Sequence, residues 1–215
     1  MIGYITGFDG DSLTIKVPFA DPARLQRQGI TQAEIRLDDG RTISAEQRRK
    51  AWALIGEISR WSGHLPEEVN AWMKYYFTLE KDMPYISLSD CSMSLARQYI
   101  DYMILFCLQN DIPCRDRLID MAEDVNAYLY GCLMNRRCAI CGRRAELHHA
   151  EGSRVGMGRN RLEIPHIGLE AYALCRKHHT EAHQMPQYEF NAKHHLFPIK
   201  INHDIAQVYA LKEEA

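Results

Sequence analysis

Hydrophobic and polar residues alternate over much of the first 43 residues of the chain. Leu13, Ile15 and Val17 stand two positions apart with polar residues between them, and an Asp-Gly pair occurs at residues 9–10 and again at 39–40. Alternation with period two is typical of β-strands, and Asp-Gly is a strong signal for the turn of a hairpin. We therefore predict a small antiparallel sheet in this part of the chain.

From Ser44 onward the hydrophobic residues recur three and four positions apart, which is the spacing of an amphipathic helix. Ser44 and Gln47 have the spacing of a capping box at the start of the first helix. The pattern predicts four helices, over residues 44–61, 66–76, 94–109 and 116–133. We interpret the aromatic residues and methionines on their apolar stripes, including Trp61, Trp72 and Tyr76, as core residues rather than as a cofactor site.

Composition places the chain among globular proteins, because 46% of its 215 residues are hydrophobic and 25% are charged. No apolar run approaches the roughly 20 residues of a membrane span, and the first residues lack the pattern of a signal peptide. We expect no membrane association. The predicted fold class is α+β, with a first domain over residues 1–133, in which the small sheet precedes the helices, and a second domain over residues 134–215.

Charge and histidine content separate the two predicted parts. Residues 1–135 hold 14 basic and 19 acidic residues, a net charge of −5, whereas residues 136–215 hold 12 and 9, a net charge of +3. Nine of the ten histidines also lie between His148 and His203. The candidate chemistry therefore belongs to the last third of the chain.

The seven cysteines fall into two groups. Because no signal peptide is recognised, we expect a reducing compartment and no disulfide framework. Four cysteines lie in apolar segments, and we interpret them as small buried hydrophobic residues: Cys91, Cys107, Cys114 and Cys132. The other three accompany histidines and need another explanation.

Two pairs of residues in the last third have the spacing of zinc ligands. Cys138 and Cys141 are separated by two residues, and Cys175 and His178 repeat that spacing at the predicted start of a helix. Four such ligands in two pairs describe a closed tetrahedral zinc site. A closed site leaves no coordination position for a substrate, so we expect it to be structural.

Four further histidines form a second set. His179 and His183 are four residues apart and share one face of a helix. His148 and His149 are adjacent in an extended segment, so their side chains point to opposite sides. One of the two can join the helical pair on a divalent ion, and the other can take a proton from water. Three imidazoles leave positions for a phosphate oxygen or a water. His194, His195 and His203 fit neither set, and we interpret them as packing or surface residues.

The combined pattern resembles the HNH endonuclease family, whose ββα-metal fold places two strands and a helix around a divalent ion. The resemblance implies that His148 binds this ion together with His179 and His183, and that His149 is the general base. It also implies that the four zinc ligands form the zinc ribbon that many members carry, with His178 in place of the commoner fourth cysteine. The ion at the histidines would be Mg²⁺, Mn²⁺, Ni²⁺ or Zn²⁺.

One position departs from the family pattern. The middle asparagine of the motif, which holds the loop between the strands, is expected about nine residues before His179, where this chain has Glu170. Asn160 and His166 lie nearby and are candidates for positioning the loop, although neither has the expected spacing. Loop geometry and the choice of metal are the features that this departure affects.

The segment between the histidine pair and the second strand is rich in arginine and glycine. Residues 136–161 contain seven arginines and two glutamates, a net charge of +5. Glycines let a backbone approach a ligand closely, and guanidinium groups bind phosphate in a forked geometry. We predict that Arg154, Arg159 and Arg161 contact the DNA backbone; the alternative is a solvated loop.

The helical part is similar to a second family. Residues 41–59, 72–77 and 87–113 look like landmarks of the lambda Orf (NinB) family, and the resemblance covers about residues 35–114. It implies a phage recombination mediator that acts as a homodimer and binds single-stranded DNA and the host single-strand-binding protein. Residues 48–50, Arg-Arg-Lys, could contact DNA or could form a solvated helix face.

We therefore expect a metal-dependent HNH endonuclease that hydrolyses DNA phosphodiester bonds during phage or prophage recombination or processing, in the bacterial host cytoplasm. The rival interpretation is a non-cleaving recombination mediator in which zinc only stabilises the fold. A resolvase for branched DNA junctions is a second rival among enzymes. These alternatives differ in whether His149 takes part in cleavage and in which DNA is cut.

Overall fold

The structure is a computed structural model of the 215-residue chain, and it describes residues 4–17, 31, 35, 40–153 and 164–213. The chain divides into two compact units, Met1–Leu37 and Asp38–Ala215. The class is mixed α+β, with small antiparallel sheets and helices. Among the described residues, no helix combines the length and apolar character that a membrane crossing requires.

The first unit contains the hairpin that residue alternation predicts. Strand β1 (Tyr4–Phe8) pairs antiparallel with β2 (Leu13–Lys16), and the Asp9 carboxylate closes the turn by accepting hydrogen bonds from the backbone and hydroxyl of Ser12, at 2.9 and 2.7 Å. Gly10 has a φ of 100°, which favours glycine at this turn. The second predicted Asp-Gly turn includes residue 39, which lies outside the described residues.

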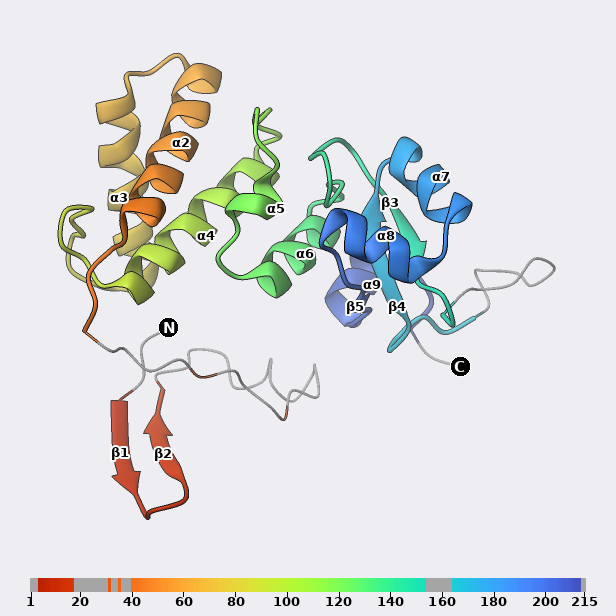
Figure 1. The fold of residues 1–215 in the computed structure, drawn as a ribbon, viewed down its shortest axis with the longest axis horizontal. Helices are drawn as coiled ribbons and strands as arrows, with labels where there is room; N and C mark the ends of the chain where they lie inside the picture. The colour runs from red at the N-terminus through yellow and green to blue at the C-terminus, as the bar shows by residue number, and fades with distance from the viewer. Residues whose placement is uncertain (1–3, 18–30, 32–34, 36–39, 154–163, 214–215) are drawn as a thin grey trace. The chain divides into compact units, whose positions relative to one another are not determined.

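The second unit begins with long helices that the sequence predicts well. They are α2 (Ala45–Ser62), α3 (Pro66–Lys81) and α4 (Met93–Gln109), drawn in orange to yellow-green in Figure 1. The capping box is confirmed, because the Ser44 hydroxyl accepts from the Gln47 backbone and the Gln47 side chain accepts from the Ser44 backbone. These reciprocal bonds satisfy backbone donors that the first turn of a helix leaves without partners.

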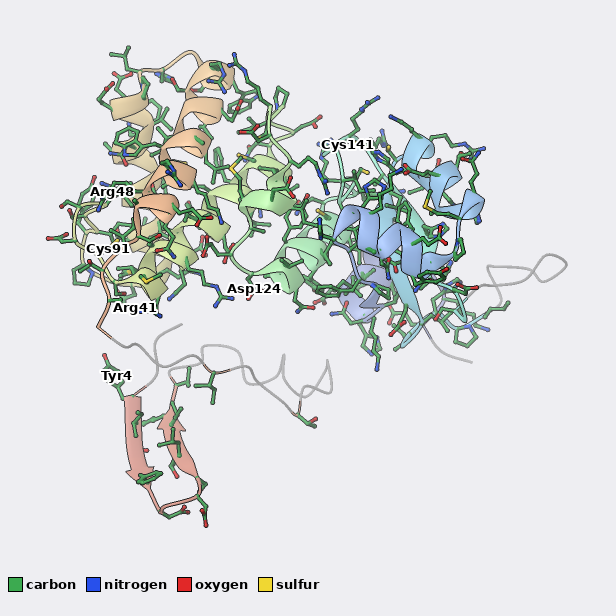
Figure 2. The ribbon with its side chains drawn as sticks, viewed as in Figure 1. Tyr4, Arg41, Arg48, Cys91, Asp124 and Cys141 are labelled. Atoms are coloured by element: carbon green, nitrogen blue, oxygen red, sulfur yellow. The ribbon has the colours of Figure 1, made fainter. Side chains whose placement is uncertain are left out.

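The prediction of one helix over residues 116–133 is wrong. The chain forms a short α5 (Leu118–Met121) and then α6 (Val125–Met134). The Asp101 carboxylate, on α4, accepts hydrogen bonds from the backbone N–H groups of Glu123 and Asp124, at 3.0 and 3.2 Å. The Asp124 side chain then caps α6 by accepting from the Ala127 backbone (Figure 2 labels Asp124). These three bonds hold the connection in a non-helical conformation.

The core prediction holds for some of the apolar side chains and fails for others. Tyr99 and Met103 on α4 are fully buried, as are Phe77 on α3 and Leu54 on α2. Trp61, Trp72 and Tyr76 are 42 to 56% exposed, so their assignment to the core is wrong. Helical periodicity marks an apolar face, but it does not say whether another element covers that face.

The four cysteines outside the zinc-ligand pattern also differ in burial. Cys107 and Cys132 are buried, as predicted, whereas Cys91 and Cys114 are only half-buried. All seven cysteines are described, and none of them forms a disulfide. The expectation of no disulfide framework therefore agrees with the structure.

A second antiparallel sheet follows α6. Its order is β3-β4-β5, formed by Glu146–His149, Glu170–Leu174 and Ile199–Lys200, and helix α7 (Arg176–Gln184) starts directly after β4. Helices α8 (Gln187–His194) and α9 (His203–Tyr209) complete this part, drawn in blue in Figure 1. Helix α6 packs against β4 and α9, and the Tyr128 hydroxyl donates to the Ala139 carbonyl at 2.9 Å. The predicted boundary between residues 133 and 134 falls at the end of α6, inside the second unit, and it stays a prediction.

Candidate metal centres

The first candidate centre begins in the tight turn after α6. The Cys138 backbone donates to the Arg143 carbonyl at 2.7 Å, and the Gly142 backbone donates to the Cys138 carbonyl at 2.8 Å. Gly142 has a φ of 69°, in the left-handed region that favours glycine. This turn brings Cys138 and Cys141 (labelled in Figure 2) onto one side of the chain.

The other half of this centre lies where β4 passes into α7. Cys175 caps the helix, and His178 lies one turn further on. The His178 Nδ1 atom is 3.2 Å from the Cys138 sulfur and 3.4 Å from the Cys175 sulfur, and the sulfurs of Cys141 and Cys175 are 3.6 Å apart. Tetrahedral zinc with Zn–S bonds of about 2.3 Å requires sulfurs about 3.8 Å apart, so the donor set fits zinc.

Burial and charge also suit a structural zinc ion at these four residues. Cys138, Cys175 and His178 are buried and Cys141 is half-buried, so most of the group lies inside the protein. The hydrogen bond between the two thiols lowers the pKa of Cys141 and raises the pKa of Cys138, so Cys141 is the first of the pair to become a thiolate. The arrangement ties the turn after α6 to the start of α7.

The second candidate centre joins β3 to α7. His148 on the strand meets His179 and His183 on the helix, with ring centroids 4.6 and 4.8 Å away, and the three candidate ligand nitrogens lie within 4.8 Å of one another. His179 and His183 stack with centroids 5.1 Å apart, as expected of residues one turn apart. His148 is buried and His183 is exposed, so the group has an inner and an outer side. Three imidazoles open to solvent on one side fit an ion with vacant coordination positions.

Glu146 supports this second centre, although it was not predicted from the sequence. Its Oε2 atom accepts a hydrogen bond from His179 Nδ1 at 3.3 Å, which directs the Nε2 atom of His179 toward the other two histidines. Burial lowers the pKa of His179, and the hydrogen bond to Glu146 opposes this shift only in part, so the imidazole favours the neutral form that a metal ligand requires. The sequence spacing could have indicated this role, because Glu146 precedes His148 by two residues and shares its face of the strand.

His149 lies on the opposite face of β3 from His148. It stands beside Ala171 of β4 in the sheet register and is half-buried. Its Nε2 atom is 2.9 Å from Nδ1 of His166, which is only 1% exposed. His149 and His166 therefore form a pair of their own beside the three clustered histidines.

The residues predicted to contact DNA or to position the loop are separate from the candidate metal ligands. The loop residues Arg154, Arg159, Asn160 and Arg161 lie outside the described residues. Glu170 starts β4, and its backbone donates to the Ser153 hydroxyl at 3.0 Å, so a serine side chain ties this end of the loop to the strand. His166 packs beside His149, as described above.

The remaining candidates make contacts within the protein. Arg48, labelled in Figure 2, donates to the Leu88 and Ser89 carbonyls, and Lys50 pairs with Glu123 at 2.8 Å, which favours a structural role for both. His194 and His203 bond to carboxylates, those of Glu181 and Glu213, and His195 is exposed. The interpretation of these three histidines as packing or surface residues stays a prediction.

Comparison with models of protein families gives a match over most of the chain. A family model described as "Putative HNHc nuclease" matches residues 21–213, which is most of the chain and includes both candidate centres. No curated protein matches the chain. No solved structure matches it either.

Proposed function

This chain belongs to the HNHc nuclease family, and we propose that it is a metal-dependent endonuclease that hydrolyses DNA phosphodiester bonds. In this proposal β3, β4 and α7 act as the ββα-metal module of the family. The observation that carries the proposal is the meeting of His148, His179 and His183, whose ligand nitrogens lie within 4.8 Å of one another. The family match, over residues 21–213, spans all three of these residues.

Each residue of the proposed site has a distinct role. His148, His179 and His183 hold a divalent ion, which supplies Lewis-acid stabilisation for the phosphate and the leaving 3′ oxygen. His149 takes a proton from the attacking water, for which an imidazole is suited near neutral pH. Glu146 orients His179 through the hydrogen bond described above. The ion is Mg²⁺, Mn²⁺, Ni²⁺ or Zn²⁺.

The cysteine-containing centre has a structural role in this proposal. Zinc on Cys138, Cys141, Cys175 and His178 fixes the start of α7, and the next residue of that helix is His179. The position of the catalytic ligands therefore depends on the zinc site. The arginines at 154, 159 and 161 hold the DNA backbone in the proposal.

The biological setting in this proposal is DNA recombination or processing in a phage or prophage, in the cytoplasm of the bacterial host. Its support is the similarity of residues 35–114 to the lambda Orf (NinB) family, which also suggests a homodimer and the host single-strand-binding protein as partners. These finer features are separable from the nuclease activity. The phage setting, the homodimer or the protein partner can each be wrong without changing the residues assigned to the site.

Replacement of His149 by alanine tests the proposed activity. With supercoiled plasmid and Mg²⁺, Mn²⁺ or Ni²⁺, we expect the wild type to cleave and His149→Ala to lose activity by about 10²- to 10⁴-fold, the usual contribution of a general base. Zinc content and circular dichroism should not change. His195→Asn is the matched control, because His195 is exposed and has a φ of 57°, a conformation that asparagine tolerates.

The outcomes separate the alternatives. A wild type that cuts no DNA with any of these ions would favour the non-cleaving mediator. Full activity in His149→Ala would refute the assignment of the base. Holliday junctions and single-stranded DNA, offered beside linear duplex, show whether the enzyme is a junction resolvase instead of a general endonuclease.

A further inference from the structure

The side chain that faces the proposed general base is another histidine. His166 Nδ1 lies 2.9 Å from His149 Nε2, with ring centroids 5.0 Å apart and ring planes inclined by 37°. His166 is 1% exposed, whereas His149 is half-buried. A buried side chain therefore contacts the proposed base from its protein side.

The backbone around His166 is held by the C-terminal part of the chain. The His166 N–H donates to the Lys212 carbonyl at 2.9 Å, and the Leu169 N–H donates back to the His166 carbonyl at 3.1 Å. Gly168 donates to the Ile201 carbonyl at 2.8 Å and has a φ of 84°, which favours glycine in this tight turn. These bonds fix the backbone that carries His166 relative to the sheet, as a residue that positions another side chain requires.

The hydrogen bond between the two rings restricts where their protons lie. A bond between two neutral imidazoles needs one protonated and one unprotonated nitrogen. If His166 Nδ1 carries the proton, His149 has used its only lone pair to accept this bond, and its own proton is on Nδ1. If His149 Nε2 carries the proton, His149 Nδ1 is unprotonated. Only the second arrangement leaves His149 with a basic nitrogen for the attacking water.

We propose that His166 is a positioning residue, which accepts a hydrogen bond at Nδ1 and so holds His149 with its proton on Nε2. This inference rests on the proposed nuclease function. The water then gives its proton to Nδ1 of His149, and the resulting imidazolium keeps its Nε2–H bond to His166. A buried acceptor that fixes the tautomer of a catalytic imidazole and stabilises its protonated form is an established arrangement in other hydrolases.

The proposal assigns His166 a different role from the one considered for it from the sequence alone. At the sequence level His166 is a candidate for holding the loop in place of the missing asparagine. In the structure its side chain contacts the proposed base, while Ser153 ties the loop to Glu170. The segment from β5 to Lys212 gains a function as well, because it holds the turn that carries His166.

Two substitutions separate positioning from packing. His166→Phe keeps a ring of similar size but removes the acceptor, and we expect kcat to fall by about 10- to 100-fold, as is typical when an orienting partner is lost. KM for DNA and the affinity for Mn²⁺ should not change. His166→Asn offers a carbonyl oxygen near the position of Nδ1, and it should restore most of kcat. His195→Asn is again the control.

The proton on the His149 ring can be observed without catalysis. Long-range ¹H–¹⁵N NMR spectra of the zinc-loaded full chain, assigned by comparison with His149→Ala, should show the His149 proton on Nε2 in the wild type. In His166→Phe the proton should redistribute to Nδ1. This spectrum tests the inference even in a protein that cuts no DNA.

Different results overturn the two proposals. A wild type without any cleavage would contradict the nuclease function, whatever the spectrum shows. A His149 proton on Nδ1 in the wild type would contradict the role of His166. So would an active enzyme in which His166→Phe has wild-type kcat, or in which His166→Asn is as impaired as His166→Phe.

Discussion

The adjacent histidines 148 and 149 have different surroundings because side chains alternate along a strand. His148 points toward α7 and meets His179 and His183, whereas His149 points the other way and meets His166. A single dipeptide thus supplies one member to a candidate metal site and one to a hydrogen-bonded pair. The same alternation places Glu146 on the face of His148 and beside His179.

Removal of the Glu146 carboxylate should weaken the histidine metal site. We expect Glu146→Ala to lower the affinity for Mn²⁺ by about 10- to 100-fold, because the His179 ring loses the acceptor that orients it. Calorimetric titration of the zinc-containing protein measures this change, and the content of tightly bound zinc should stay constant.

A matched variant separates this effect from simple loss of charge. Arg176 is 3.9 Å from the same carboxylate, and its side chain is 83% exposed, so Arg176→Gln also breaks an ion pair of Glu146. We expect Arg176→Gln to bind Mn²⁺ nearly as the wild type does. Equal affinity in Glu146→Ala and the wild type would show that Glu146 does not support the site.

Residue spacing could predict part of the candidate site. The pairs Cys138–Cys141, Cys175–His178 and His179–His183 follow from local spacing, because turns and helices fix the direction of residues three or four positions apart. The pairing of His149 with His166 could not be predicted in this way. The two residues are 17 positions apart, and the turn that carries His166 is held by Ile201 and Lys212, which are more distant still along the chain.

Among the helices, sequence signals predicted a helix end where neighbouring residues in the chain form that end. Ser44 and Gln47 form the predicted capping box, and α2, α3 and α4 follow the predicted spans closely. The break between α5 and α6 depends instead on Asp101, a residue of α4 that lies 22 positions before Glu123. Helical periodicity within residues 116–133 contains no information about this distant carboxylate.

Helices α7 and α8 are joined by an ion-pair network that should make stability depend on pH. The Glu181 carboxylate contacts Lys193 at 2.7 Å and His194 at 3.0 Å. The hydrogen bond from Lys193, together with that from His194, lowers the pKa of Glu181 to about 2. Because the folded pKa is below the ordinary value of 4.5, the stabilisation is complete above about pH 5 and disappears as the pH falls toward 2.

The Glu181→Gln variant tests this network. After allowance for solvent screening, we expect it to lower the free energy of unfolding by about 1 to 2 kcal/mol at pH 6 to 7. Urea unfolding at a series of pH values should show this difference shrinking below about pH 4.5. Glu189→Gln, a change at an exposed residue of α8, should show no such trend. A Glu181→Gln deficit that is the same at pH 3 and pH 7 would contradict the assigned pKa.

At the scale of the whole chain, the candidate metal centres are not isolated from the helical part. Residues 38–215 form one compact unit, and α6 packs against β4 of the sheet that carries the histidines. The change in charge and histidine content along the sequence marks the last third, where both groups of possible metal ligands lie. The change in composition could not indicate that α6 packs against both the helical part and the sheet, because this depends on which face of α6 meets the sheet.

The two candidate centres meet on α7, where His178 belongs to one and His179 to the other. Adjacent positions on a helix point about 100° apart, so a single element can serve both groups. Zinc at the first centre should therefore fix the orientation of the ligands at the second. We propose that these are two separate metal sites, one with a structural zinc ion and one with an exchangeable divalent ion.

Metal content tests this claim most directly. After dialysis of the purified chain against EDTA, we predict one zinc ion per chain, and titration with Mn²⁺ should then show one further site. His183→Ala should keep the zinc and lose only the Mn²⁺ site. A wild type that retains no zinc, or a His183→Ala variant that loses both metals together, would contradict the division into two sites.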